Sequence, residues 1–306
     1  MTNNEIVIYR YHKDFDLVRE RLKLIKYFDP EIRIYGIFGG NSSNFDEATK
    51  SLDNLIENNY LVKSEDGNWK WLHADITYKM WFEDYGQNID FDRAYVLEWD
   101  LLIVGSLRNI YTNQESNTIY CSGLISIDRV KKFWYWTNDQ NLPKISSFFQ
   151  KVKDTFNTSF VQYAMLGPGL SAPRKFFEGL KTLNLFEAEV TDEVKVPVWA
   201  QLLGLKLKNN HFYNRWFSYF EMRYFNANVG TIRPKVVLKQ LKKINGRRVF
   251  HPFRENLSAQ SLIEWYEKAP QNGISSFYKR PARPAVVIFP FTYKFHCKLS
   301  NIFLGV

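Results

Sequence analysis

Two carboxylates stand one residue apart in an otherwise apolar stretch of the sequence. Residues 91–105, FDRAYVLEWDLLIVG, read as a buried strand, yet Glu98 and Asp100 interrupt it. Such a pair is repulsive unless a divalent cation lies between the two side chains and other oxygen atoms complete its shell. A cation held by one or two carboxylates usually takes substrate phosphates as its remaining ligands. The motif therefore predicts a diphosphate held through Mg²⁺ or Mn²⁺, and the alternative is a surface pair at a strand terminus.

The elements around this motif alternate between strands and helices. Residues 5–9 and 32–38 are short apolar, β-branched runs, and a helix is expected between them, from Asp14 or Asp16 to about Phe28. Further helices are expected over 46–58 and 76–86, with a strand over 60–64. This pattern predicts one α/β domain with a mostly parallel, open sheet flanked by helices. Ligands bind such sheets at the carboxyl ends of the strands, where Glu98 and Asp100 are expected to lie.

The second half of the chain is less regular. Residues 118–127 read as a strand with a kink at its glycine. Residues 165–180, MLGPGLSAPRKFFEGL, predict a Gly/Pro loop followed by a helix that begins at Pro173. In VPVWAQLLG, a helix is expected with Pro197 in its first turn and Gly204 just past its end, the positions that these residues favour.

The order of these motifs resembles that of the GT-A fold glycosyltransferases, which use nucleotide-sugar donors. YVLEWD is similar to the acid-x-acid motif that holds the metal on the donor diphosphate in that family, with Glu98 in place of the commoner Asp. The resemblance implies that Asp100 is the stronger metal ligand and that Glu98 binds metal, water or ribose. RRVFHPFRE resembles the segment with a late histidine, so His251 would complete the shell. Imidazole suits Mn²⁺ better than Mg²⁺, and the alternative for His251 is a packed aromatic side chain.

The resemblance also implies a site for the donor, a UDP- or GDP-linked sugar, beside the first strands. Basic side chains there would put positive charge near a diphosphate, and glycines would let the backbone approach a base or ribose. The simpler alternatives are polar or tight turns and, for the acidic residue, the cap of the helix that begins at Ile76. The residues concerned are Tyr9, Arg10, His12, Gly39, Gly40 and Asp75.

The acceptor side is expected later in the chain. TDEVKVPVWAQLLGL resembles the acidic segment before a helix that lines the acceptor site in the family, and residues 165–180 resemble the loop and helix beside donor sugar and acceptor. Asp192 or Glu193 would then be the base that deprotonates a hydroxyl of a glycan or lipid-linked acceptor. The alternative is a solvated acidic loop.

Composition limits the class of protein. The 306 residues are 45% hydrophobic and 24% charged, as in ordinary soluble globular proteins. Two cysteines provide neither a disulfide framework nor a zinc cluster. No signal peptide or membrane-spanning run is recognisable, so we expect a cytoplasmic protein, with peripheral association at a membrane as the alternative.

The positive charge is concentrated in the last third. Residues 222–254 contain basic residues and no acidic ones, and the same holds for residues 271–306. Such asymmetry attracts nucleic acid, anionic lipid headgroups or a phosphate-bearing substrate, or it is simply a solvated basic face. The expected organisation is a catalytic domain over 1–256, with a nucleotide-binding half to about 105 and an acceptor half over 106–256. Residues 257–306 form a basic aromatic extension, which contacts anionic membrane or packs back as a strand or lid.

Two other functions fit parts of the pattern. A nucleotidyltransferase that makes a sugar nucleotide is disfavoured because no Gly-rich, basic phosphate loop follows the first strand directly. A nucleic-acid-binding protein would explain the basic, aromatic C-terminal third. It is disfavoured because the basic residues match no recognised binding motif and the α/β half would be unexplained, so no nucleic-acid partner is expected.

Overall fold

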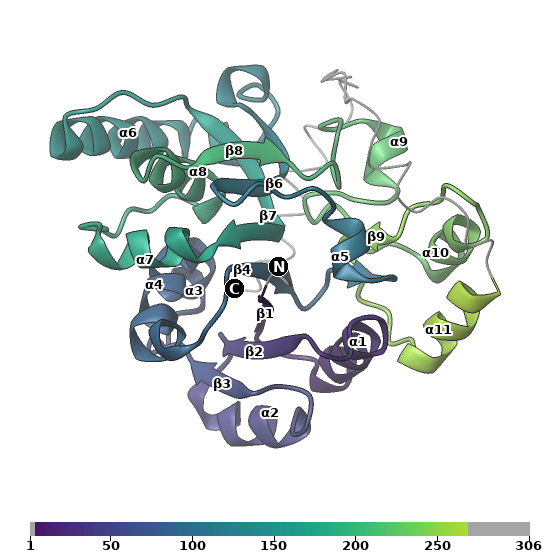
Figure 1. Ribbon diagram of the computed structural model, residues 1–306. Coiled ribbons are helices and arrows are strands. Elements are labelled where there is room, and N and C mark those ends of the chain that lie inside the picture. The colour runs from purple at the N-terminus through teal and green to yellow at the C-terminus, as the bar shows by residue number, and fades with distance from the viewer. Residues whose placement is uncertain (1–3, 269–306) are drawn as a thin grey trace.

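The computed structural model describes residues 4–268, which form an α/β fold around one seven-stranded sheet (Figure 1). In spatial order the strands are β3 (Asn58–Leu61), β2 (Arg33–Phe38), β1 (Glu5–Tyr11), β4 (Arg93–Glu98), β7 (Tyr163–Pro173), β6 (Thr118–Ser126) and β8 (Lys206–Asn209). Strand β1 pairs in parallel with β2 and β4, β2 with β3, and β6 with β8, while β7 runs antiparallel to β4 and β6. The expected mostly parallel sheet is therefore confirmed.

Helices cover both faces of this sheet, which is why its central strands are apolar on both sides. In Figure 1, α1 (Phe15–Phe28) and α11 (Ala259–Glu267) lie on one side. The helices α4 (Ala74–Asp84), α7 (Arg174–Thr182) and α8 (Asp192–Leu202) lie on the other. The remaining helices are α2 (Phe45–Ser51), α3 (Gly67–Leu72), α5 (Leu107–Ile110), α6 (Leu142–Phe156), α9 (Tyr219–Met222) and α10 (Pro234–Leu241), with short 3₁₀ turns η1 (Ser42–Asn44), η2 (Gly86–Asn88), η3 (Ile127–Arg129) and η4 (Tyr135–Thr137).

The run that contains Glu98 and Asp100 is two strands, not one. Strand β4 ends at Glu98, and after a turn the short β5 (Leu102–Ile103) pairs antiparallel with β9 (Val249–Phe250) in a separate two-stranded sheet. The two carboxylates therefore lie at and just beyond the carboxyl end of a central parallel strand. This is the edge where the sequence placed them.

Residues 165–173 form a strand, and the predicted Gly/Pro loop is wrong. Glycine and proline normally disfavour strand interiors, but here the pairing of β7 with β6 is irregular and absorbs them. Gly169 adopts a φ of +82°, and the carbonyl of Pro168 accepts a hydrogen bond of 2.6 Å from the Ser122 hydroxyl. The following helix begins at Arg174, one residue later than expected.

Helix α8 begins earlier than the sequence pattern indicated. Thr191 caps it by accepting a hydrogen bond of 3.3 Å from the Glu193 N–H, so Pro197 lies inside the helix and not in its first turn. Asp192 and Glu193 consequently form the first helical turn, which corrects the alternative of a solvated loop. A second correction concerns α2, which ends at Ser51 and not near residue 58.

The last described helix is part of the folded body. Helix α11 contacts α1, and its Leu262 is buried in a second apolar cluster with Leu102 and Phe253. The predicted contact of residues 271–306 with a membrane, and the alternative packed tail, lie outside the described residues. Within residues 4–268, no helix combines the length and the apolar character needed to cross a membrane.

Candidate active site

Strand register brings Arg10 beside Glu98. The two residues are direct neighbours on the parallel pair β1 and β4, and Arg10 Nη1 donates a hydrogen bond of 3.1 Å to Glu98 Oε1. The same guanidinium atom donates to the hydroxyl of Tyr78 on α4, at 3.1 Å. Arg10 therefore has a fixed orientation at the carboxyl edge of the sheet.

The pairing of β5 with β9 brings His251 to Asp100. Leu102 lies opposite Phe250, so the chain beyond β9 runs back along the turn that precedes β5. The Phe253 N–H then donates a hydrogen bond of 2.7 Å to the Asp100 carbonyl. Two segments about 150 residues apart in the sequence are thereby joined at Asp100.

One ring nitrogen of His251 is buried without a hydrogen-bond partner among residues 4–268. Nδ1 lies 2.8 Å from the Asn226 carbonyl oxygen, which fixes the proton on Nδ1 in the neutral ring. The lone pair of Nε2 then faces Asp100 Oδ1 at 3.3 Å, with Nε2 buried and unsatisfied as a hydrogen-bonding atom. Two lone pairs face each other across this gap, so the contact is favourable only when a proton or a cation lies between them.

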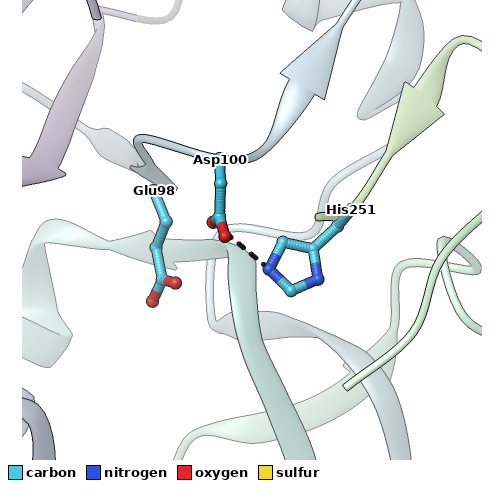
Figure 2. Close-up of side chains that lie close together, drawn as sticks. All are labelled: Glu98, Asp100 and His251. Atoms are coloured by element: carbon cyan, nitrogen blue, oxygen red, sulfur yellow. Dashed lines mark ion pairs between the residues drawn. The ribbon is translucent and has the colours of Figure 1, made fainter. Parts of the chain in front are cut away.

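Glu98 completes the group. One potential ligand atom from each of Glu98, Asp100 and His251 lies within 4.8 Å of the other two, and Figure 2 shows the three side chains directed toward a common region. Two carboxylate oxygens and one imidazole nitrogen suit Mn²⁺, and Mg²⁺ less well. The hydrogen bond from Nδ1 to a backbone carbonyl is the usual outer-shell support of a metal-binding histidine. The donor set therefore fits a divalent cation.

Asp100 is held in its ionised form. Burial alone would raise the pKa of Asp100, but His251 and Arg254 outweigh it and lower that pKa to about 2. Arg254 contributes hydrogen bonds from Nε at 3.0 Å and an ion pair from Nη2 at 2.9 Å, both to Oδ2. Oδ1, the other oxygen, faces His251.

Glu98 is more finely balanced. Burial raises the pKa of Glu98, the Arg10 guanidinium opposes the rise, and the nearby Asp100 carboxylate adds to it. A bound cation would favour the ionised form of Glu98 further, because it adds positive charge to that of Arg10 beside this carboxylate.

Asp192 and Glu193 reach the same edge of the sheet from α8. Arg10 Nη1 lies 3.7 Å from Asp192 Oδ2, and Glu193 Oε1 accepts a hydrogen bond of 3.0 Å from the Gly167 N–H. Gly167 also adjoins Glu98, since a Cβ added at Gly167 would lie 3.2 Å from Glu98 Oε1. Burial raises the pKa of Asp192, and burial together with Asp192 raises that of Glu193 well above its ordinary value. Raised carboxyl pKa values suit groups that exchange protons near neutral pH.

The other predicted donor residues occupy different positions. Tyr9 is buried, and its hydroxyl lies 3.4 Å from the Trp99 carbonyl oxygen. His12 is exposed beside the ring of Trp99. Gly39 and Gly40 follow β2, and a Cβ at Gly40 would lie 2.5 Å from the His12 carbonyl oxygen. Only glycine therefore permits this approach of the backbone after β2 to that after β1.

Asp75 neither caps a helix nor faces the site. It lies in the first turn of α4, where the N-cap residue is His73, and it is fully buried. Its carboxylate is paired with Lys195 Nζ at 2.8 Å and accepts a hydrogen bond of 2.8 Å from Trp199 Nε1. Both oxygens face α8, so the predicted ribose contact of Asp75 is not supported by its position.

Sequence reasoning missed two members of the site. Arg254 lies three residues after His251 and was read only as part of a basic segment. Tyr78 lies one helical turn after Asp75, in the helix expected over 76–86, and no role in the site was expected for it. Lys13 belongs to the basic turn after the first strand that was expected to lie near a diphosphate. Its Nζ lies 5.1 Å from the centre of the Trp99 ring, and the Arg254 guanidinium lies 5.6 Å from the same ring. The signal for both cations was the tryptophan between the two acids of the motif.

Comparisons with known proteins add the following. No protein-family model matches the chain, and no curated protein matches it in sequence. Among solved structures, it is similar to galactosyltransferase LgtC in complex with donor and acceptor sugar analogues, with 11% identity over 69% of this chain and 75% of that one, at a TM-score of 0.39. It is also similar to the bifunctional glycosyltransferase WbbM, with 8% identity over 88% of this chain and 50% of that one, at a TM-score of 0.40.

A third similar structure is core-mannan synthase A from Aspergillus fumigatus in a Mn/GDP form. It shows 9% identity over 67% of this chain and 72% of that one, at a TM-score of 0.35. Likenesses of this degree concern the course of the backbone, and they assign no role to any residue of this chain.

Proposed function

We propose that the chain is a metal-dependent glycosyltransferase that moves a sugar from a nucleotide-sugar donor to a hydroxyl of a glycan or lipid-linked acceptor. The observation that carries the proposal is the group of Glu98, Asp100 and His251 at the carboxyl edge of a parallel sheet, with the buried Nε2 of His251 lacking a hydrogen-bond partner among residues 4–268. A group built to hold a cation at that edge is what a diphosphate-bearing substrate requires.

On the donor side, the chain supplies ligands, positive charge and a close backbone approach. Glu98, Asp100 and His251 would hold Mn²⁺ or Mg²⁺, which when bound would neutralise charge on the leaving nucleoside diphosphate. Lys13 and Arg254 both lie over Trp99, between the two acids, and add cationic groups beside the same position. The nucleoside of the UDP or GDP group would lie toward Tyr9, Arg10, His12 and the glycines after β2.

On the acceptor side, α8 supplies the acids. Asp192 is within ion-pair distance of Arg10, which also binds Glu98, so the two ends of the site share one guanidinium. Asp192 or Glu193 would orient the acceptor hydroxyl and accept its proton. Glu193 has the more strongly raised pKa of the two, so its carboxylate is the stronger base once it is deprotonated.

The test is incubation of the full chain with a panel of UDP-, GDP-, CDP- and dTDP-sugars in the presence of Mn²⁺. Metal-dependent release of the nucleoside diphosphate from one donor is the expected result. Release of nucleoside triphosphate on addition of pyrophosphate would support the nucleotidyltransferase alternative instead. Tight binding of an oligonucleotide without either reaction would contradict both enzyme functions.

We also propose a domain over residues 1–256 that carries this activity, followed by a basic aromatic extension over 257–306 of which the part after residue 270 makes a peripheral contact with anionic membrane. The support is the mixture of basic and aromatic residues after residue 270. Co-sedimentation of the full chain with vesicles containing phosphatidylserine, at low and at high salt, tests the contact. Salt-sensitive pelleting is expected, and no pelleting at low salt would contradict it.

A further inference from the structure

The short helix α9 carries two strongly exposed aromatic side chains. Phe220 is 70% exposed and Tyr219 is 62% exposed, with their ring centres 5.8 Å apart. Ile244, in the turn after α10, is 52% exposed. Within residues 4–268, these are the three most exposed large apolar side chains. Single exposed apolar residues are common, but a group of them on one surface marks an interaction site.

Two contacts join the segment of α9 to the segment of Ile244. Glu221 on α9 forms a buried ion pair with Arg247, which follows Ile244 by three residues. The hydroxyl of Tyr224, just after α9, accepts a hydrogen bond of 3.2 Å from Gln240 Nε2 on α10. The two helices therefore lie on the same side of the molecule, as Figure 1 shows, and their exposed residues belong to one region of its surface.

Helix α10 adds a stripe of positive charge to this region. Lys235, Lys239 and Lys242 are exposed and recur at the spacing of residues that share one face of a helix. Val237 and Leu241, on the other face, are buried in the apolar cluster that also contains part of α11. The lysine stripe is therefore held outward by the packing of α10 against the folded body.

The same stretch of chain contains almost no acid. Over residues 215–245 the acidic residue is Glu221, which is buried in its ion pair. Arg215 and Arg223 are exposed on either side of α9, and the Arg223 guanidinium lies 5.5 Å from the centre of the Tyr219 ring. The surface around the two aromatic rings thus combines apolar groups with exposed positive charge.

From this arrangement we infer that α9, α10 and the turn after α10 form a surface that docks on an anionic lipid membrane. Interfacial binding needs apolar side chains for the headgroup boundary and cations for the anionic headgroups. Tyr219, Phe220 and Ile244 supply the apolar side chains, and the lysines of α10 supply the charge. Ile244 favours lipid over nucleic acid, since bases stack on aromatic rings and an aliphatic side chain offers no such face. This surface is distinct from the contact proposed for the part after residue 270.

Docking at this surface would bring the metal-binding group close to the membrane. The His251 N–H donates a hydrogen bond of 3.1 Å to the Tyr224 carbonyl, and His251 Nδ1 lies 2.8 Å from the Asn226 carbonyl oxygen. Both carbonyls follow α9 directly, so a few residues separate the docking surface from the support of His251. A lipid-linked acceptor would then be the one within reach. That consequence rests on the proposed function, whereas the docking itself does not.

The test is co-sedimentation of the full chain with vesicles of phosphatidylcholine and phosphatidylserine in equal parts, beside vesicles of phosphatidylcholine alone. The double variant Tyr219→Ala/Phe220→Ala should lower the partition coefficient on the anionic vesicles by about tenfold or more, because two rings no longer enter the boundary layer. Trp71→Ala removes a 47% exposed aromatic residue from α3 and should leave the coefficient unchanged. Circular dichroism checks that each variant is folded. Equal pelleting of the double variant and the wild type, or no pelleting of either at low salt, would overturn the docking surface.

Charge reversal tests the lysine stripe. Lys235→Glu/Lys239→Glu should lower the partition coefficient by about tenfold at low salt and by less at high salt, since salt screens the attraction to the headgroups. The matched control is Lys50→Glu/Lys153→Glu, which changes the same net charge at exposed lysines on α2 and α6 and should have a much smaller effect. Equal losses from the two pairs would show a general attraction of a basic protein and would overturn the surface.

Two further comparisons identify the surface and its partner. In a chain with Lys279→Glu, Arg280→Glu and Arg283→Glu, the α9 double variant should still lower vesicle binding. Binding that these three changes abolish and the α9 variant leaves intact would support the contact after residue 270 alone and overturn the α9–α10 surface. Binding of an oligonucleotide that Lys235→Glu/Lys239→Glu abolishes, with vesicle binding unchanged, would make nucleic acid the partner and overturn the membrane. None of these measurements requires sugar transfer, so their outcome is separate from that of the proposed function.

Discussion

Asp100 and Asp75 are both buried aspartates, and both are joined to segments far away in the sequence. Asp75 is fully buried, and its two oxygens are taken by Lys195 and Trp199 from a single helix. Lys195 also donates to His73 Nδ1 at 2.9 Å, and burial and Lys195 lower the pKa of His73, which keeps that ring neutral. In this group a cation lies beside a single carboxylate.

Asp100 is 3% exposed, yet its surroundings are not complementary in this way. Its Oδ2 is bound by Arg254, but its Oδ1 faces the ring nitrogen Nε2 of His251 at 3.3 Å, with a second carboxylate, Glu98, close by. An ion pair between α4 and α8 fixes the two helices to each other, whereas several acceptor atoms directed at one region favour binding of a cation. The comparison teaches that burial of a carboxylate does not identify a site, but a second carboxylate and an imidazole nitrogen directed at the same region do.

The largest effect is expected when the group of Glu98, Asp100 and His251 loses the carboxylate of Asp100. Asp100→Asn should lower transfer by about 1000-fold or more, about 4 kcal/mol of transition-state stabilisation, because the amide offers no charge to the cation. Glu98→Gln should do similar but lesser damage. Turnover with saturating Mn²⁺ and circular dichroism are the measurements, with Asp46→Asn, an exposed acid on α2, as control. Near-native turnover in folded Asp100→Asn would remove Asp100 from the metal site.

Breaking the ion pair between Asp75 and Lys195 should lower the stability of the fold rather than the rate of transfer. Lys195→Met leaves the Asp75 carboxylate buried without its cation, which typically costs about 3–5 kcal/mol of the free energy of unfolding. Urea denaturation measures it, and Lys153→Met on the exposed side of α6 is expected to stay within about 0.5 kcal/mol of the wild type. Adding Asp75→Asn should restore part of the loss. A Lys195→Met protein as stable as the wild type would refute the structural role of this pair.

The acids of α8 should separate acceptor chemistry from donor binding. Either Asp192→Asn or Glu193→Gln is expected to lower turnover by about 100- to 10,000-fold, the usual contribution of a general base. Calorimetry with the nucleoside diphosphate and Mn²⁺ should give the wild-type affinity for that variant. Lost diphosphate binding in both variants, or full activity in both, would contradict an acceptor-side role.

The smallest effect is the pH dependence of stability that Asp100 contributes. The pKa of Asp100 is lowered from 3.8 to about 2 in the folded chain, so its contribution is complete above about pH 4 and is lost as the pH falls toward 2. The difference corresponds to about 2 kcal/mol. Urea denaturation in the presence of a chelator, from pH 6 to pH 3, should show a steeper loss for the wild type than for Asp100→Asn. Parallel curves would show that Asp100 is not stabilised as an anion.

Much of the fold followed from local pattern. Runs of apolar, β-branched residues and the helical periodicity between them predicted β1, α1, β2 and the parallel arrangement of the sheet. Because a parallel strand ends at the edge where ligands bind, the same pattern placed Glu98 and Asp100 at that edge. These features depend on residues close together in the sequence, which is why they could be read from it.

Other features depended on which distant segments meet. Residues 163–173 form a strand because β4 and β6 lie on either side of them and supply hydrogen-bond partners. The glycine and proline content of this segment by itself disfavours a strand. The sequence indicated a helix cap or a ribose contact for Asp75. In the structure, Lys195, 120 positions later in the chain, forms an ion pair with the Asp75 carboxylate.

The sequence by itself determined the alternation of strands and helices and the position of the acid pair at a strand end, since hydrophobic periodicity acts over a few residues. Only the tertiary structure decided that Arg254 and His251 reach Asp100, through the pairing of β5 with β9, and that Asp75 is closed off by α8. Long-range pairing is set by the packing of whole elements against one another, and residue type alone does not specify the partner of a buried charge.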